Sequence, residues 1–348
     1  MTNVLMGISL HAIGGIAAAS CFLPQRYAPK WKFQTYWLLF CFFAWLIIPI
    51  TVAAIVVPDF IEIIAQSPTS SIVNTTLYGA IYGFGGMAFG VAIRFIGFSL
   101  TYTVAIGISA VVGTVIPAVI AGTLIEGFSS NAGLIVLAGF ITSLLGVAIC
   151  GKAGLLKDKD KEETQDNTNM KKGLILASVA GVLSGVFGLA LSAGDEITQT
   201  AASFGAVNFK GYVTYIFAMG GAFLTNAVWW SIVHFKQNTW QEYLGVMPES
   251  NTVNKSMLPK YYIIALISGL LWYGQFFFYG LGHIRMGDFE FISWGIHMSM
   301  LIFFSFGVGF LLKEWQGLSS RTLNTLYLGL FILLLSFCLI TYGSWLGA

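Results

Sequence analysis

The sequence predicts an all-α integral membrane protein with about ten transmembrane helices, arranged as two inverted five-helix repeats. Two features of the composition support the membrane assignment. Apolar residues make up 57% of the 348 residues and charged residues only 9%, whereas soluble domains carry roughly 25% charge. The chain also has 40 glycines, and small residues let membrane helices approach one another closely.

The third observation is a series of apolar runs, each close to the length of about 20 residues that a helix needs to cross a bilayer. Because the bilayer core holds no water, each run must satisfy its own backbone hydrogen bonds and is expected to be helical. Pro49 lies inside the second run and is expected to kink it. The runs cover residues 4–23, 36–57, 72–93, 98–121, 132–151, 173–193, 211–234, 260–281, 289–312 and 322–346.

Basic residues are distributed unevenly among the loops between these runs. The even-numbered loops hold only Lys210 and Arg285. Because basic loops remain in the cytoplasm, we expect a multi-pass protein of the inner (plasma) membrane with both termini on the outer, periplasmic side. The fifteen basic residues of the odd-numbered loops are Arg26, Lys30, Lys32, Arg94, Lys152, Lys157, Lys159, Lys161, Lys171, Lys172, Lys236, Lys255, Lys260, Lys313 and Arg321.

A polar linker at residues 152–172, expected in the cytoplasm, divides the chain into an N-terminal repeat of residues 1–151 and a C-terminal repeat of residues 173–348. The third and eighth runs resemble each other, and so do the first and sixth. An odd number of helices in each repeat would give the two halves opposite orientations, which is typical of secondary transporters with a binding site near mid-membrane. The matched glycines are Gly79 and Gly269, Gly90 and Gly280, Gly97 and Gly287, Gly7 and Gly173, and Gly15 and Gly181.

Near their centres the runs contain neutral polar and aromatic side chains but no Asp, Glu, Lys or Arg. This argues against a channel lined by charged rings and against transport of a strongly charged solute. Aromatic rings can cover the C–H faces of a sugar, and amide, hydroxyl and imidazole groups can bind its hydroxyls. Ser109 is also central, and the predicted substrate-binding residues are His11, Tyr82, Asn226, Trp272, Gln275, Trp294 and His297.

Three residues are candidates for coupling transport to protons. His11 and His297 lie in the membrane interior, where ionisable residues are functional candidates, and histidine titrates near neutral pH. Glu290 opens the ninth run at its outer end. The alternatives are a neutral histidine bonded between helices, an interfacial Glu290 favoured by the helix dipole, and an Asn226 that staples helices together.

Other classes of function find little support. The four cysteines sit in apolar runs without metal-ligand spacing, and the net charge of +2 gives no reason to expect a nucleic-acid partner. No catalytic arrangement of carboxylates, or of Ser, His and Asp, is visible. We therefore expect no enzyme activity, no cofactor and no metal, and we expect a neutral solute, protons and the lipid bilayer as partners.

Several segments resemble one known family. LLWYGQFFFYGLGHIRMGDFEFISWGIHMSM at residues 270–300, GISLHAIGGIAAASCFLP at 7–24, IRFIGFSLTYTVAIGISAVVGTVIPAVI at 93–120 and MGGAFLTN at 219–226 resemble the L-rhamnose–proton symporter family of the drug/metabolite transporter superfamily. Glu290 stands at that family's acidic position before ISW. The third run departs from the family pattern, since Gly86 and Met87 occupy a segment that should contain a polar residue.

The resemblance implies ten spans and the import of a neutral deoxy sugar, L-rhamnose or a close relative, in symport with protons by alternating access. Two alternatives remain open at this point. One is another transporter of the same superfamily that exports small metabolites, and the other is a membrane sugar sensor that moves nothing. Movement of sugar into sealed liposomes would separate a transporter from a sensor.

Overall fold

The computed structural model describes residues 2–120, 122, 125, 128–160, 167–247 and 252–347. Across this part of the chain the structure is almost entirely helical, which confirms the prediction of an all-α membrane protein. The described strands are a two-residue antiparallel pair, β1 (Val246–Met247) and β2 (Thr252–Val253).

Within the described residues, nine helices are long and apolar enough to span a membrane, and Leu100–Gly113 forms a shorter apolar helix. Each of the predicted runs falls on helical structure. The α-helices are α1 (Thr2–Ser20), α2 (Phe33–Cys41), α3 (Ile48–Val56), α4 (Phe60–Gln66), α5 (Thr69–Ile120), α7 (Asn131–Asp160), α8 (Asn167–Ala193), α9 (Asp195–Ser203), α10 (Tyr212–Gln237), α11 (Leu258–His283), α12 (Ser293–Leu311) and α13 (Ser320–Leu346). Short 3₁₀ turns are η1 (Pro24–Tyr27), η3 (Trp240–Leu244), η4 (Lys255–Met257) and η5 (Gly287–Ile292).

Two helices deviate from regular α geometry. The third and fourth predicted runs are joined in α5 by a kink at Gly97, whose φ of 74° and ψ of 175° are readily adopted by glycine. The second run consists of α2, a π-helical turn η2 (Phe42–Ile47) and α3. This π turn directly precedes Pro49, which has no N–H to donate to the preceding turn, so the irregularity is where the proline predicts it.

The described residues cluster into two compact units that do not follow the order of the sequence. The first unit contains Met1–Ala19, Gly85–Leu189 and Phe278–Ala348, and the second contains Ser20–Phe84 and Ala190–Phe277. Each unit therefore combines segments from both halves of the chain.

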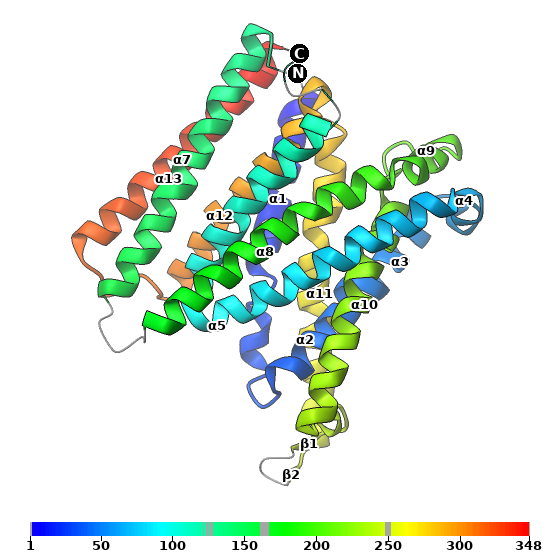
Figure 1. The fold of residues 1–348 in the computed structure, drawn as a ribbon, viewed down its shortest axis with the longest axis vertical. Helices are drawn as coiled ribbons and strands as arrows, with labels where there is room; N and C mark the ends of the chain where they lie inside the picture. Colours follow the sequence, from blue (N-terminus) through cyan, green and yellow to red (C-terminus); the bar gives the residue numbers. More distant parts are fainter. Residues whose placement is uncertain are drawn as a thin grey trace. The chain divides into compact units, whose positions relative to one another are not determined.

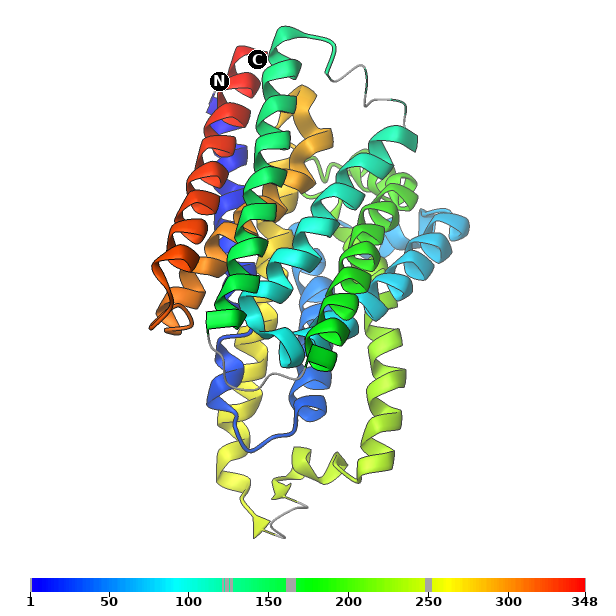
Figure 2. The ribbon, with the colours of Figure 1, turned by 60° about the vertical axis from the view of Figure 1, so that its left-hand side comes forward.

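In the first unit, α7 and α13 lie side by side along most of their length (Figure 1, Figure 2). Glycines make this approach possible: a Cβ atom on Gly329 would lie 2.6 Å from the sulfur of Cys150. Near the start of α13, the Asp160 carboxylate accepts hydrogen bonds from the Thr322 hydroxyl and the Ser319 N–H. These hydrogen bonds lower the pKa of Asp160.

The chain termini lie together at one end of the first unit, and the end of α7 and the start of α8 lie at the other (Figure 1, Figure 2). Helices extend into the predicted polar linker from both sides, since α7 continues to Asp160 and α8 begins at Asn167. Residues 161–166 lie outside the described part of the chain.

In the second unit, α10 packs against the first part of α5 at very close range. A Cβ atom on Gly79 would lie 2.0 Å from the carbonyl oxygen of Ala218, and one on Gly221 would lie 2.1 Å from the carbonyl oxygen of Thr76. The Thr225 hydroxyl donates to the carbonyl of Ala80 at 2.9 Å. The two backbones thus meet through small residues, as is common between membrane helices.

This contact gives a test with a neighbouring control. We expect Gly221→Ala to lower the stability of the protein by about 1–3 kcal/mol, because the added methyl group overlaps a backbone atom and forces the helices apart. Gly220→Ala should leave stability unchanged, since a Cβ atom there would meet nothing within 4 Å. Thermal unfolding in detergent measures both variants, and equal melting temperatures would contradict the packing described here.

Candidate functional site

The predicted site residues divide between the two units. His11, Glu290, Trp294 and His297 belong to the first unit. Tyr82, Asn226, Trp272 and Gln275 belong to the second unit.

In the first unit, His11 and His297 come together in a buried cluster with Tyr279, Ser293 and Trp294, which we call the histidine cluster. The ring centroids of His11 and His297 are 5.7 Å apart. The Tyr279 ring lies 5.5 Å from that of His11 and 5.4 Å from that of His297. Both histidines are almost completely buried, so α1, α11 and α12 together enclose two imidazoles.

The histidine cluster contains polar atoms that the protein itself leaves unsatisfied. His11 Nε2 is 2.7 Å from the Ser293 hydroxyl. By contrast, His11 Nδ1 and both ring nitrogens of His297 are buried and have no hydrogen-bond partner in the described structure. A buried polar atom without a partner costs roughly 1–3 kcal/mol, so this group of atoms is suited to a ligand rich in hydrogen-bonding groups.

Trp294 forms an aromatic wall of the histidine cluster. Its indole N–H donates to the backbone carbonyl of Ser109 at 3.1 Å, which fixes the ring between α12 and α5. The ring stacks on Phe187 at 6.0 Å and meets Tyr279 edge-on at 5.5 Å. A Cβ atom on Gly113 would lie 2.5 Å from the indole nitrogen, so this glycine provides the space for Trp294.

A second glycine provides the space for His11. A Cβ atom on Gly282 would lie 2.9 Å from the carbonyl oxygen of Gly7 and 3.0 Å from the His11 ring. Glycines at 7 and 282 therefore let α1 and α11 approach closely enough for His11 to reach Tyr279. In the GLGH segment at residues 280–283, Gly282 therefore serves helix packing, and His283 provides a polar side chain.

In the second unit, Tyr82 and Trp272 both contact Trp45, which lies in the π turn η2. The Trp45 ring centroid is 6.1 Å from that of Tyr82 and 5.4 Å from that of Trp272. Trp272 also lies 4.8 Å from Phe276, and Gln275 is buried on the same helix. π turns inside helices occur frequently at functional sites, and this one positions an indole whose buried N–H has no partner among the described residues.

Asn226 is fully engaged with neighbouring helices. Its amide N–H groups donate to the carbonyls of Gly83 and Ala222, both at 3.0 Å, and its oxygen accepts from the indole N–H of Trp37 at 3.0 Å. The side chain is completely buried. These bonds use both donors of the amide, which favours the helix-stapling alternative for this residue.

Glu290 lies in η5 with its side chain about half exposed, and its Oε2 is 3.9 Å from Nε2 of His283. His283, Tyr279 and Ser293 were not predicted as site residues from the sequence. Each is adjacent to a predicted feature, but only the packing of α1 against α11 and α12 brings them to the histidines. Among the described residues, no three His, Cys, Asp or Glu side chains gather as metal ligands.

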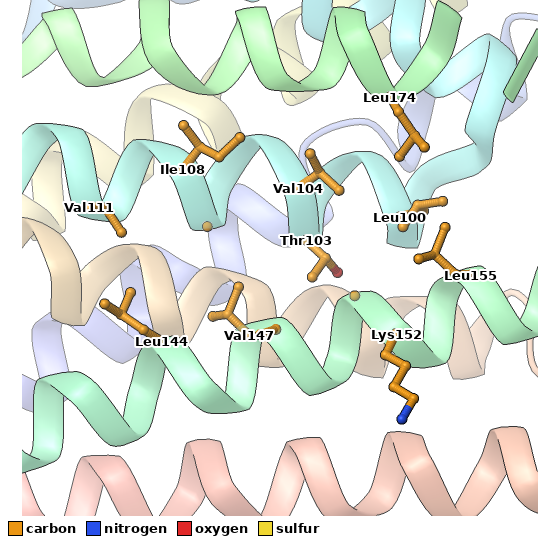
Figure 3. Close-up of a pocket in the computed structure, with 13 residues that line it drawn as sticks. Leu100, Thr103, Val104, Ile108, Val111, Leu144, Val147, Lys152, Leu155 and Leu174 are labelled. Carbon is orange, nitrogen blue, oxygen red and sulfur yellow. The ribbon is translucent and has the colours of Figure 1, made fainter. Parts of the chain in front are cut away.

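A separate groove lies among α5, α7 and α8 of the first unit, with a volume of about 440 Å³. Its lining is apolar apart from Thr103 and Lys152, and the Lys152 ammonium points away from it (Figure 3). A sugar site needs several polar groups, so we do not assign the groove to a sugar. The labelled apolar side chains are Leu100, Val104, Ile108, Val111, Leu144, Val147, Leu155 and Leu174.

The fold and the site define a multi-pass membrane transporter, with apolar helices surrounding buried, neutral, hydrogen-bonding groups. Comparison with known proteins specifies the family. The family described as "L-rhamnose-proton symport protein (RhaT)" matches residues 1–345. The chain belongs to this family.

Proteins named L-rhamnose-proton symporter are similar to this chain along nearly the whole length. Those of Citrobacter koseri and Salmonella paratyphi A are 31% identical and that of Shigella sonnei is 30% identical, each over 346 residues that cover 99% of both chains. No solved structure matches.

The contacts of Asn226 lead to a prediction. We expect Asn226→Ala to lower stability by about 1–3 kcal/mol, because the Trp37 N–H loses its acceptor in a buried site, while the affinity for substrate stays unchanged. Leu224→Ala, on the exposed face of the same helix, is the control. Thermal unfolding and equilibrium sugar binding would separate the two effects; a stable variant that no longer binds sugar would instead place Asn226 at the substrate.

Proposed function

We propose that this protein imports L-rhamnose or a closely related neutral sugar in symport with protons, by alternating access across the inner (plasma) membrane. Membership of the symport family and the names of the relatives support the substrate and the coupling ion. The sugar would bind near mid-membrane, where a solute can be reached from either side as the helices rearrange.

One observation carries the assignment of the site. The ring nitrogens of His297 and Nδ1 of His11 are buried without hydrogen-bond partners in the described structure, beside two aromatic rings. Neutral imidazoles can both donate and accept, as sugar hydroxyls do. The rings of Tyr279 and Trp294 can cover the C–H surface and the methyl group of a deoxy sugar.

The second unit contributes further candidates to the proposal. Tyr82 and Trp272 provide ring faces around Trp45, and Gln275 provides an amide on the same helix as Trp272. Asn226 was also predicted as a ligand, but its described bonds support a structural role, and the proposal does not place it at the sugar.

The proposed proton carriers are Glu290, His11 and His297. Glu290 is accessible to solvent and close to an imidazole, and the two buried histidines lie where the sugar would bind. Coupling requires the sugar to bind more tightly when the carrier is protonated, and the proton then binds more tightly when sugar is present, because such linkage is reciprocal.

The composition of the two units supports the proposed inverted repeats. Most of the first and sixth runs share a unit with the fourth, fifth, ninth and tenth runs. The second run and most of the third share the other unit with the seventh run and most of the eighth. A duplication after five spans would pair each run with the run five places later. The two runs of every such pair lie mostly in the same unit. The basic loops support termini on the periplasmic side and residues 152–172 in the cytoplasm.

Uptake by purified protein tests the function directly. Proteoliposomes with an inward-directed proton gradient should accumulate labelled L-rhamnose above its external concentration, and a protonophore should abolish the accumulation. If no rhamnose enters, the substrate is wrong. If rhamnose equilibrates without accumulating, the protein is not a symporter.

His297 should be needed for binding. We expect His297→Phe to raise the Kd for the sugar by roughly tenfold or more, because the ring shape is kept while the ligand loses a buried hydrogen bond worth about 1–3 kcal/mol. The control is Met298→Leu, at the next buried position of α12. Equilibrium binding measures both, and an unchanged Kd in the His297 variant would remove this residue from the site.

Glu290 should be needed for coupling. We expect Glu290→Gln to abolish gradient-driven accumulation while sugar exchange across the membrane continues, since the amide cannot take up a proton. Asp288→Asn, at a second exposed acid of η5, should accumulate sugar normally. Comparing accumulation with exchange in the same vesicles checks this, and normal accumulation by the Glu290 variant would move the coupling role to His11 or His297.

A further inference from the structure

The proposed route of the proton lacks an intermediate group between the surface and the buried histidines. Glu290 lies at the exposed end of the site, whereas His11 and His297 are buried within it. A carboxylate at the surface cannot deliver a proton to a buried imidazole without an intermediate group, because proton transfer needs donor and acceptor atoms within hydrogen-bond reach, directly or through one water.

His283, in the last turn of α11, lies between Glu290 and Tyr279. Its Nε2 is 3.9 Å from Oε2 of Glu290. On its other side the imidazole ring stacks on Tyr279 with centroids 5.6 Å apart. Tyr279 in turn contacts the rings of both buried histidines, so titratable groups follow one another from Glu290 to the site.

The orientation of the His283 ring matches a transfer role. Its Nε2 faces Glu290, and the side chain is 36% exposed, yet its Nδ1 is buried from solvent. One nitrogen of the imidazole thus faces the exposed side of the site, and the other faces the buried side. An imidazole can accept a proton on one nitrogen and release one from the other.

Arg285 and Asp288, the described ionisable residues closest to His283 in the sequence, do not form a competing route. Arg285 directs its guanidinium Nη1 to the carbonyl oxygen of Leu281 at 2.6 Å, and arginine stays protonated. Asp288 is exposed in η5. Glu290 therefore connects His283 with the exposed mouth of the site. Tyr279 connects His283 with the buried pair, of which His11 is one member.

We propose that His283 is the proton-transfer residue between Glu290 and the His11–His297 pair. A proton moves from water to the Glu290 carboxylate and, once Oε2 and Nε2 of His283 close from 3.9 Å to hydrogen-bond distance, to that Nε2. A proton then leaves Nδ1 and passes through water to the buried pair, beside the Tyr279 ring. No bond other than O–H and N–H bonds forms or breaks, and a flip of the neutral ring then turns its unprotonated nitrogen back toward Glu290. This inference rests on the proposed proton symport.

The alternative is that His283 only supports the Tyr279 ring by stacking. His283→Phe separates the two roles, because it keeps a ring against Tyr279 but cannot carry a proton. His283→Gln is a second variant with polarity but without a titratable group. Both are assayed in proteoliposomes for sugar exchange, for gradient-driven accumulation and for sugar-dependent acidification of the lumen, which a pH-sensitive dye reports. Asp288→Asn is the matched control at the same mouth.

We expect both variants to exchange sugar at the normal rate and to lose accumulation and lumen acidification by roughly tenfold or more, since a positioned proton-transfer group contributes about 10²–10⁴-fold. The double variant His283→Phe with Glu290→Gln should be no worse than either single variant, because the two residues act in series. Normal accumulation by His283→Phe would overturn the proposal, and so would loss of exchange together with accumulation. A wild-type protein that moves no rhamnose would instead refute the proposed function.

Discussion

Water is absent from the core of a bilayer, and this constraint governs how the structure treats its polar groups. Helices satisfy the hydrogen bonds of their own backbones. Several buried polar side chains form hydrogen bonds with neighbouring helices, as Asn226 does with Gly83 and Ser143 does with Ser299. Some buried polar atoms lack such partners, among them the Trp45 indole N–H, and three of them, Nδ1 of His11 and both nitrogens of His297, gather in the histidine cluster. A ligand that supplied the missing hydrogen bonds would remove this cost, which supports the proposed sugar site at these atoms.

The same absence of water changes what holds the helices together. Lipid tails are as apolar as leucine, so close packing and hydrogen bonds must replace the hydrophobic effect between helices. Gly221 against Thr76, and Gly7 against Gly282, bring backbones together where any side chain would collide. The approach of α1 to α11 also places His11 beside Tyr279. The contacts that pack these helices together therefore also position the residues of the histidine cluster.

A neutral sugar and a proton make different demands on one site. The sugar needs uncharged hydrogen-bonding groups and ring faces, whereas coupling needs a group that changes charge. Histidine meets both demands, because its neutral form binds hydroxyls and its protonated form stores the transported ion. In the proposed mechanism, the Glu290 carboxylate takes up protons at the exposed end, away from the buried histidine cluster.

The sequence by itself determined the membrane class, the helical runs and the family, because burial in lipid imposes a length and a composition that a single chain displays directly. It also selected His11, Trp294 and His297, since polar residues are scarce in such runs. Only the tertiary structure decided which of them meet. His11 reaches Tyr279 and His297 through glycines on distant helices, Asn226 is engaged by Trp37, and His283 bridges toward Glu290. These relations depend on side-chain contacts between segments far apart in the chain, and periodicity within one run carries no information about its neighbours.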